Sequence, residues 1–262
     1  MWLPRASAIR TSPPLRRSAL VVAVVLACSG VAAAANFAYL PAVVTLAPAD
    51  RVAVMLLTNL SDSPLRVELK NQRWDQTLNG DVMLEPSNDL LVTPQVMTLR
   101  PHQTLSVRIA LMGRRGEREK SYRLVVTELP PFFAPAQLPG LAVRTRSAVN
   151  VPVFVAPLGA AKTSGAIADA VARGGFVTFS LVNTGTVHFK NQRVAVTALG
   201  PNAQRLFVRT LEAWYVLPGE HRKYRLELDK AICRQIRAVT ISVDGGVRLD
   251  RTLEVDPAQA CR

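Results

Sequence analysis

Residues 52–69 of the chain are VAVMLLTNLSDSPLRVEL. An apolar run ends at Asn59, a polar turn with Asp62 and Pro64 follows, and apolar and polar residues then alternate. Alternation with a period of two places successive side chains on opposite faces of a β-strand, and Asn, Asp, Ser and Pro favour tight turns. The segment therefore predicts two β-strands joined by a turn.

The same pattern occurs again later in the chain. Residues 176–183 are FVTFSLVN, an apolar run that also ends in Asn and precedes a turn with Gly185. A second echo follows, because LRPHQ at 99–103 and LPGEH at 217–221 each lead into an alternating strand. The duplication predicts an all-β chain with two copies of one sandwich domain of about 100 residues each.

Composition agrees with a folded all-β protein. Of the 262 residues, 49% are hydrophobic and 19% charged, which argues against disorder, and 18 Pro and 14 Gly interrupt short strand patterns.

Residues 156–159 form the expected boundary between the two domains, which gives domains 36–156 and 157–262. Residues 160–175 are expected to hold a short helix or the first strand of the second domain. Further strands are predicted at 90–99, 122–128, 143–155, 205–215, 238–243 and 247–255.

The N-terminus has the pattern of an export signal. A basic segment ends at Arg16-Arg17, residues 18–32 are uncharged, and an alanine run precedes Asn36. We expect a Sec signal peptide over residues 1–35, cleavage after Ala35, and no stable membrane insertion afterwards. The alternatives are a retained membrane anchor, a lipoprotein site at Cys28, and twin-arginine export.

Two features bear on compartment and partners. The net charge is +13, and four arginines lie in residues 1–35, so the rest keeps 28 basic and 19 acidic residues, a net charge of +9. This excess favours an anionic partner.

Removal of the signal leaves two cysteines, Cys233 and Cys261. They are expected to form a disulfide in an oxidising compartment, with two free thiols as the alternative.

Catalytic and metal-binding patterns are missing from the sequence. His102, His188 and His221 lie at predicted turns or strand starts and are expected to be solvated, and the chain has no HExxH or GxSxG motif. Basic residues mix with acids along alternating strands, with no pair of aromatic residues typical of RNA binding. We therefore expect no enzyme activity, no cofactor, no metal and no nucleic-acid partner.

Residues 141–155 predict a long strand with two different faces. Odd positions run from Leu141 to Val155 and are mostly apolar, whereas even positions include Arg144 and Arg146. Such a strand suits an exposed edge that pairs with another chain, and an ordinary last strand of a sandwich is the alternative.

The chain resembles the PapD-like periplasmic chaperones of chaperone–usher pilus assembly, particularly the archaic branch that serves spore-coat-protein-U-like and Csu-type pilins. The matching segments cover nearly the whole mature chain. They are Asn59 with 62–65 (DSPL), 73–74 (RW), 90–94 (LLVTP), 107–108 (VR), 121–130 (SYRLVVTELP), 151–155 (VPVFV), 182–185 (VNTG), 217–219 (LPG) and the late cysteine pair.

The resemblance implies two immunoglobulin-like domains at an angle, in the periplasm, that lend a strand to a pilin or spore-coat-like subunit and deliver it to an outer-membrane usher. The donor residues would be Leu141, Val143, Val149 and Val151, extended by Phe132, Phe133 and Leu138. Thr145 and Ser147 would interrupt this apolar face.

Family members usually hold the subunit's terminal carboxylate with two basic residues, and here the chain departs from that pattern. Val43 occupies the first position, and Pro152 or Ala148 the second. The candidate anchors are instead Arg144, Arg146, Arg108 and Arg123. An exported surface adhesion or structural protein without chaperone activity, and a secreted polyanion-binding module, are the alternative functions.

Overall fold

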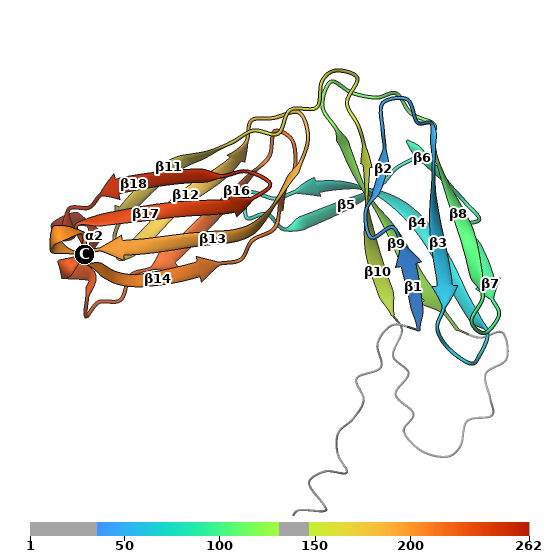
Figure 1. The fold of residues 1–262 in the computed structure, drawn as a ribbon, viewed down its shortest axis with the longest axis horizontal. Coiled ribbons are helices and arrows are strands. Elements are labelled where there is room, and N and C mark those ends of the chain that lie inside the picture. The colour runs from blue at the N-terminus through green and yellow to red at the C-terminus, as the bar shows by residue number, and fades with distance from the viewer. Residues whose placement is uncertain (1–35, 131–146, 262) are drawn as a thin grey trace, which may run out of the picture. The chain divides into compact units, whose positions relative to one another are not determined.

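The computed structural model of the chain describes residues 36–130 and 147–261 (Figure 1). The predicted signal peptide and the first part of the predicted strand 143–155 lie outside these residues. Within the described ranges, no helix has both the length and the apolar character needed to cross a membrane. The expected all-β architecture with two sandwiches is confirmed by the sheets described next.

Strands β1 to β10 form the two sheets of the first sandwich. One sheet has the order β1 (Phe37–Leu40), β3 (Val52–Asn59), β8 (Thr104–Leu111) and β6 (Leu90–Thr93). The other has the order β2 (Val44–Leu46), β10 (Ala148–Val155), β9 (Lys120–Leu129), β4 (Leu65–Gln76) and β5 (Val82–Pro86), and β7 (Val96–Leu99) also pairs with β4. Leu57, Val67 and Ile109 are fully buried between these sheets. The inward-facing half of each alternating strand therefore forms one apolar core.

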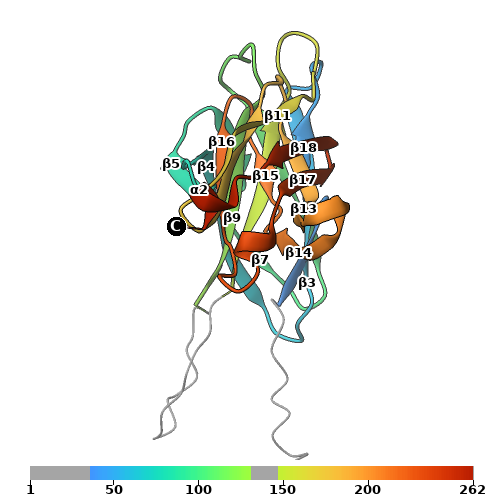
Figure 2. The same cartoon turned by 90° about the vertical axis from the view of Figure 1, so that its left-hand side faces the viewer.

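Strands β11 to β18 form the second sandwich. One sheet has the order β11 (Gly165–Arg173), β12 (Phe176–Asn183) and β16 (His221–Glu227). The other has the order β14 (Arg205–Leu211), β13 (Phe189–Leu199), β17 (Ala238–Gly245) and β18 (Leu249–Glu254), with β15 (Tyr215–Val216) beside β13. Two short 3₁₀ turns, η2 (Pro201–Ala203) and η3 (Cys233–Gln235), and the helix α2 (Pro257–Ala260) near the C-terminus complete it (Figure 2). Its core is separate from that of the first sandwich.

The two asparagines of the sequence repeat make the same turn in both sandwiches. Asn59 is buried, its side-chain amide donates to the carbonyl of Ser63 at 2.8 Å, and its side-chain oxygen accepts from the Ser61 amide at 2.9 Å. Asn183 is also buried and repeats this arrangement with the Val187 carbonyl at 3.0 Å and the Gly185 amide at 2.8 Å. The duplication is thus also a repeat of hydrogen bonding, since each amide satisfies backbone groups that the turn would leave unpaired.

Two predicted strands are each divided in the structure, and one open choice is decided. The predicted strand 90–99 is two strands, β6 and β7, which lie in different sheets because Pro94 has no amide hydrogen to continue a ladder. The predicted strand 205–215 is likewise divided into β14 and β15. Residues 160–175, where a helix or a strand was possible, contain strand β11.

Candidate functional site

Strand β10 has an edge that is only partly covered. It pairs with β9 over its whole length, Ala148–Val155, but with β2 only over Val153–Val155. Within the described part of the chain, residues 148–152 therefore have a strand partner on one side only. Unpaired backbone amides and carbonyls along a strand edge are a template for another strand. The geometry of β10 permits one further chain to join this sheet.

The side chains of β10 alternate as the sequence predicts. Val149 is partly buried against the core of the first sandwich, and Val151 is fully buried within it. Ala148 and Asn150 are exposed, and Phe154 is buried on the opposite face of the sheet. Val149 and Val151 thus share one face. Leu141 and Val143, the other two predicted donor residues, lie outside the described residues, as do Phe132, Phe133 and Leu138.

The structure separates the candidate anchor arginines. Arg108 is exposed on β8, where it lies opposite Val54 and Thr93 on the outer face of the first sheet. Arg123 lies on β9 in the other sheet, directly opposite Pro152 of β10, and alternates with core residues, so it faces away from the core. The core therefore lies between the two side chains. Arg144 and Arg146 lie outside the described residues.

Arg123 is the buried cation of the first sandwich, with 5% of its surface exposed. Its guanidinium carbon lies 3.6 Å from the centroid of the Trp74 ring, and one Nη donates to the carbonyl of Asn150 at 3.3 Å. The Nε atom is buried and has no hydrogen-bond partner. A guanidinium has five N–H donors, and to the described residues Arg123 makes one hydrogen bond, to Asn150.

No acidic side chain in the described ranges forms an ion pair with Arg123. Burial lowers the pKa of Arg123, because removal of the guanidinium from water disfavours its charged form. The attraction to the Trp74 ring offsets part of this cost. A guanidinium with an unpartnered N–H has the chemistry to donate a charge-assisted hydrogen bond to an anion.

The aromatic side chains around Arg123 come from both sandwiches. Trp74, Phe154, Tyr215 and Leu217 form a small apolar cluster of their own. Gln76 of β4 joins the two sandwiches, because its amide donates to the Tyr215 carbonyl at 2.9 Å and its oxygen accepts from the Leu217 amide at 2.9 Å. This pair of hydrogen bonds fixes the Tyr215 backbone, and the Tyr215 ring centroid lies 5.9 Å from the guanidinium of Arg123.

His188 is not the solvated loop histidine that the sequence predicts. Its ring stacks on Phe154 with centroids 3.6 Å apart, and Nδ1 donates to the Glu119 carboxylate at 2.7 Å. The backbone amide of His188 donates to the same oxygen at 3.1 Å. No local pattern predicts this contact, because Glu119 comes just before β9 in the first sandwich and His188 just before β13 in the second.

Gln76, Trp74 and Tyr215 are parts of the site that the sequence did not predict. Trp74 was noted only as the end of a family motif, and Tyr215 only as the end of a predicted strand. Their burial, at 1% and 6% exposed, and their distance to Arg123 identify them. The available signal was the alternation on β4, which places Trp74 and Gln76 on the face opposite the core residue Leu69.

The predicted cysteine pair forms a disulfide. Cys233 of η3 and Cys261 after α2 are bonded, and Cys233 is buried in the core of the second sandwich. The bond ties the C-terminal segment to the core of the second sandwich, far along the chain from β10. Its role is therefore structural.

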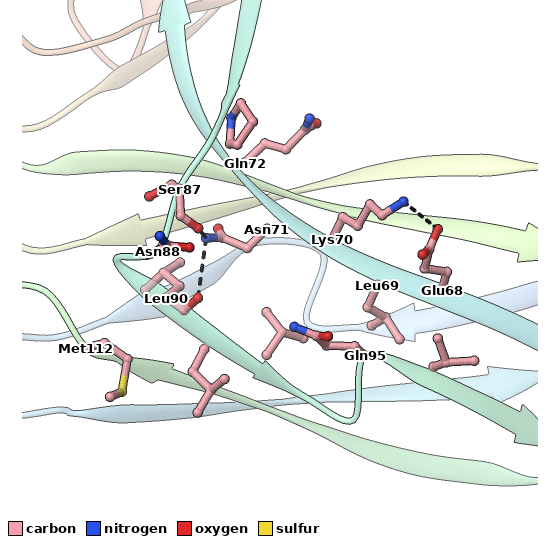
Figure 3. Close-up of a pocket in the computed structure, with 14 residues that line it drawn as sticks. Glu68, Leu69, Lys70, Asn71, Gln72, Ser87, Asn88, Leu90, Gln95 and Met112 are labelled. Carbon is pink, nitrogen blue, oxygen red and sulfur yellow. Dashed lines mark hydrogen bonds and ion pairs between the residues drawn. The ribbon is translucent and has the colours of Figure 1, made fainter.

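A hollow of about 640 Å³ in the first sandwich lies between β4 and strands β6 and β7 (Figure 3). Its wall contains the ion pair of Lys70 with Glu68 at 2.9 Å, and the Asn71 amide donates to the Ser87 carbonyl at 3.0 Å. Lys70 is therefore already paired with an acid. Among residues 36–130 and 147–155, Arg123 is the buried charged residue, and it has no ion pair, so its face of the sheet is the stronger candidate site.

Comparison with known families finds a match that covers the first sandwich. Residues 31–161, half of the chain, match the model of the pili and flagellar-assembly chaperone family, PapD N-terminal domain. A search of curated protein sequences gives no match.

Solved structures of similar fold include three from pilus systems. The complex of CsuC and CsuE, a chaperone–tip adhesion subunit pre-assembly complex from archaic Csu pili of Acinetobacter baumannii, is 14% identical and has a TM-score of 0.56 over 83% of this chain and 98% of that chain. The class 5 fimbriae chaperone CfaA is 13% identical, with a TM-score of 0.55 over 84% and 100%. The complex of the Salmonella enterica SafA pilin with the SafB chaperone is 15% identical, with a TM-score of 0.52 over 85% and 98%. At these identities the likeness establishes the fold.

Proposed function

Because the chain belongs to the family of pili and flagellar-assembly chaperones, we propose that it captures a pilus or spore-coat-like subunit by strand donation and delivers it to an outer-membrane usher. The observation that carries this proposal is β10 itself, whose residues 148–152 have one edge open in the described chain and whose other edge pairs with β9, the strand of the buried Arg123. The edge offers a strand to the subunit, and the cation offers a partner for its terminal carboxylate.

The open edge supplies the main-chain part of the interaction. A subunit strand that joins residues 148–152 satisfies backbone groups that have no strand partner in the described chain. The side chains of Leu141, Val143 and Val149 are proposed to fill the subunit's groove on the same face. Val151 is proposed to mark the end of the donor segment, because its side chain already fills the chaperone's own core. No covalent chemistry is needed for this exchange.

Arg123 is proposed as the carboxylate anchor. The resemblance places Val43, and Pro152 or Ala148, where family members usually have basic residues, and none of these side chains carries a positive charge. Arg123 lies on the next strand directly opposite Pro152, so a guanidinium is still available beside that position. The planar guanidinium can bind both carboxylate oxygens at once, which fixes the position at which the subunit chain ends.

The family also sets the proposed compartment. We propose that the protein works in the periplasm after Sec export and removal of residues 1–35, with the domain boundary between Ala156 and Pro157. The disulfide between Cys233 and Cys261 is consistent with an oxidising compartment.

The test is co-expression of the tagged mature chain with the pilin-like protein encoded beside its gene, followed by affinity purification from periplasm and mass measurement of the complex. We expect a one-to-one complex, and degradation of the subunit when it is expressed alone. A chain that purifies as a monomer, with a subunit that survives without it, would refute the proposal and favour a surface adhesion or structural protein.

A further inference from the structure

We propose that Arg115 is a positioning residue for the edge of β10 that receives the subunit. Arg115 lies in the loop between β8 and β9 and holds the end of β2 against the end of β10. The position of β2 in turn fixes where strand addition to β10 must stop. This consequence for the subunit rests on the proposed function, whereas the contact of Arg115 with the two strand ends does not.

The guanidinium of Arg115 donates to four backbone carbonyls. One Nη bonds to the carbonyl of Leu46 at 3.1 Å and to that of Ala156 at 2.9 Å. The other Nη bonds to the carbonyl of Ala47 at 2.6 Å and to that of Asp50. In the part of the chain that the structure describes, Arg115 has no ion pair. Its charge-assisted hydrogen bonds are therefore directed at the backbone.

These carbonyls belong to segments that are far apart in the sequence. Leu46 is the last residue of β2, and Ala156 follows the last residue of β10. The Ala156 amide also donates to the Leu46 carbonyl at 3.0 Å, so this carbonyl accepts from both the strand ladder and Arg115. Gly116, the next residue of the loop, accepts from the Leu158 amide at 2.9 Å. The loop therefore joins the two strand ends at the point where their ladder finishes.

The pairing of β2 with β10 is short and needs a further contact to define its register. It is parallel and covers three residues of each strand, Val44–Leu46 and Val153–Val155 (Figure 1). The two apolar side chains of β2 are buried, which fixes the side of β2 that faces the core. A shift of β2 by two residues would keep the same side inward, so burial alone does not select the register. The bonds of Arg115 select it, because they need the carbonyls of Leu46 and Ala156 close together.

The register of β2 decides how much of β10 is open. The first paired residue of β2, Val44, lies opposite Val153, so a strand that joins residues 148–152 meets β2 there and stops. Arg115 acts at the other end of β2, on the carbonyls of residues 46, 47, 50 and 156. A change in subunit binding on loss of Arg115 would therefore report the position of β2.

The first measurement is hydrogen exchange of the Ala156 amide in the free chain, which needs no subunit. Arg115→Met removes the four bonds but keeps a long side chain. We expect exchange of this amide to become about ten-fold faster or more, the scale of one lost hydrogen bond to a charged group, while the amides of the β4–β9 ladder keep their protection. Arg115→Lys, with its donors on a single atom, should fall between. Arg114→Met, at an exposed neighbour in the same loop, is the matched control and should exchange like the wild type.

The second measurement is affinity for the neighbouring pilin-like subunit, with a crosslink as the rescue. We expect Arg115→Met to bind about ten-fold more weakly, because a fraction of the molecules then has β2 in the register that binding requires. Val44→Cys with Val153→Cys places two thiols on adjacent strands about 4.8 Å apart, within the Cα distances that disulfides span. In the Arg115→Met chain this crosslink should restore the affinity, whereas Val44→Cys alone should not.

The outcomes separate this inference from the proposed function. Unchanged exchange of the Ala156 amide in the Arg115→Met chain overturns the role of Arg115 at the strand ends. Lost affinity that the crosslink does not restore overturns the positioning role, because Arg115 would then act on the subunit in another way. If the wild-type chain binds no subunit, the proposed function fails, and the exchange result still decides whether Arg115 holds β2.

Discussion

Replacement of Arg123 by methionine should separate binding from folding. The variant keeps a long, unbranched side chain but removes the charge and the donors. We expect it to bind the subunit far more weakly, with little or no loss in the stability of the free protein. That combination is unusual for a substitution at a residue that is only 5% exposed.

The stability estimate comes from the contacts of Arg123. The variant loses one long hydrogen bond, 3.3 Å to the Asn150 carbonyl, and the contact with the Trp74 ring at 3.6 Å. A desolvated cation–aromatic contact is worth about 2 kcal/mol and one hydrogen bond about 1 kcal/mol. Against this, burial of an unpaired charge costs several kcal/mol, and that cost disappears with methionine. The free energy of unfolding should therefore change by about 1 kcal/mol or less, or increase.

The binding estimate follows from the carboxylate contact. Charge-assisted hydrogen bonds contribute about 1.5–3 kcal/mol, which corresponds to a loss of about 10- to 150-fold in subunit affinity. Urea unfolding monitored by circular dichroism gives the stability, and calorimetry with the purified subunit gives the affinity. Arg108→Met is the matched control, because Arg108 is exposed on the outer face of the other sheet and should affect neither quantity.

The opposite pattern would refute the reasoning. If Arg123→Met lowers the free energy of unfolding by about 3 kcal/mol or more and leaves the affinity unchanged, then Arg123 is a structural residue of the sandwich junction. The carboxylate anchor would then have to be sought at Arg144 or Arg146.

Three other perturbations test different parts of the structure. Val149→Asp, at the partly buried end of β10, should abolish subunit capture while the chain stays folded. Val151→Asp should instead unfold the first sandwich, because it buries a carboxylate in the core. Circular dichroism distinguishes a folded from an unfolded variant, and a folded, inactive Val151→Asp chain would show that Val151 is not a core residue. The Cys233→Ala, Cys261→Ala double variant loses the disulfide, which closes a loop with a sequence separation of 28. Its free energy of unfolding should be lower by about 3–4 kcal/mol, measured by urea unfolding. An unchanged unfolding midpoint would exclude a stabilising role for the bond. A hydrogen bond from Tyr122 is the main reason that the pKa of Asp89 is lowered. The stability that ionised Asp89 provides is therefore present at neutral pH and is lost as pH falls below about 4. The Asp89→Asn variant should be less stable than the wild type at pH 7 and should lose less stability on acidification, and parallel pH profiles of the two proteins would contradict this.

The sequence alone determined the class of fold and its duplication. The alternation after Asn59, and its echo around Asn183, predicts strands and turns because these signals are local: side-chain period, turn residues and the missing amide of proline act within a few residues. The cysteine pair was also predictable, since only two cysteines remain after the expected signal cleavage. The odd and even faces of β10 follow from the same period of two, which the burial of Val151 confirms for the described part of the strand.

The tertiary structure alone decided which cation is buried and what surrounds it. Arg108 and Arg123 look alike in the sequence, because each is a single arginine in an alternating strand. They differ because the outer face of β8 is exposed, whereas the outer face of β9 is covered by Trp74 and by Tyr215 from the other sandwich. Contacts between residues so far apart in the chain depend on the packing of one sheet against another domain, and no short-range pattern encodes that packing. The physical character of the site, a desolvated guanidinium without an acid, therefore arises only when the two sandwiches meet.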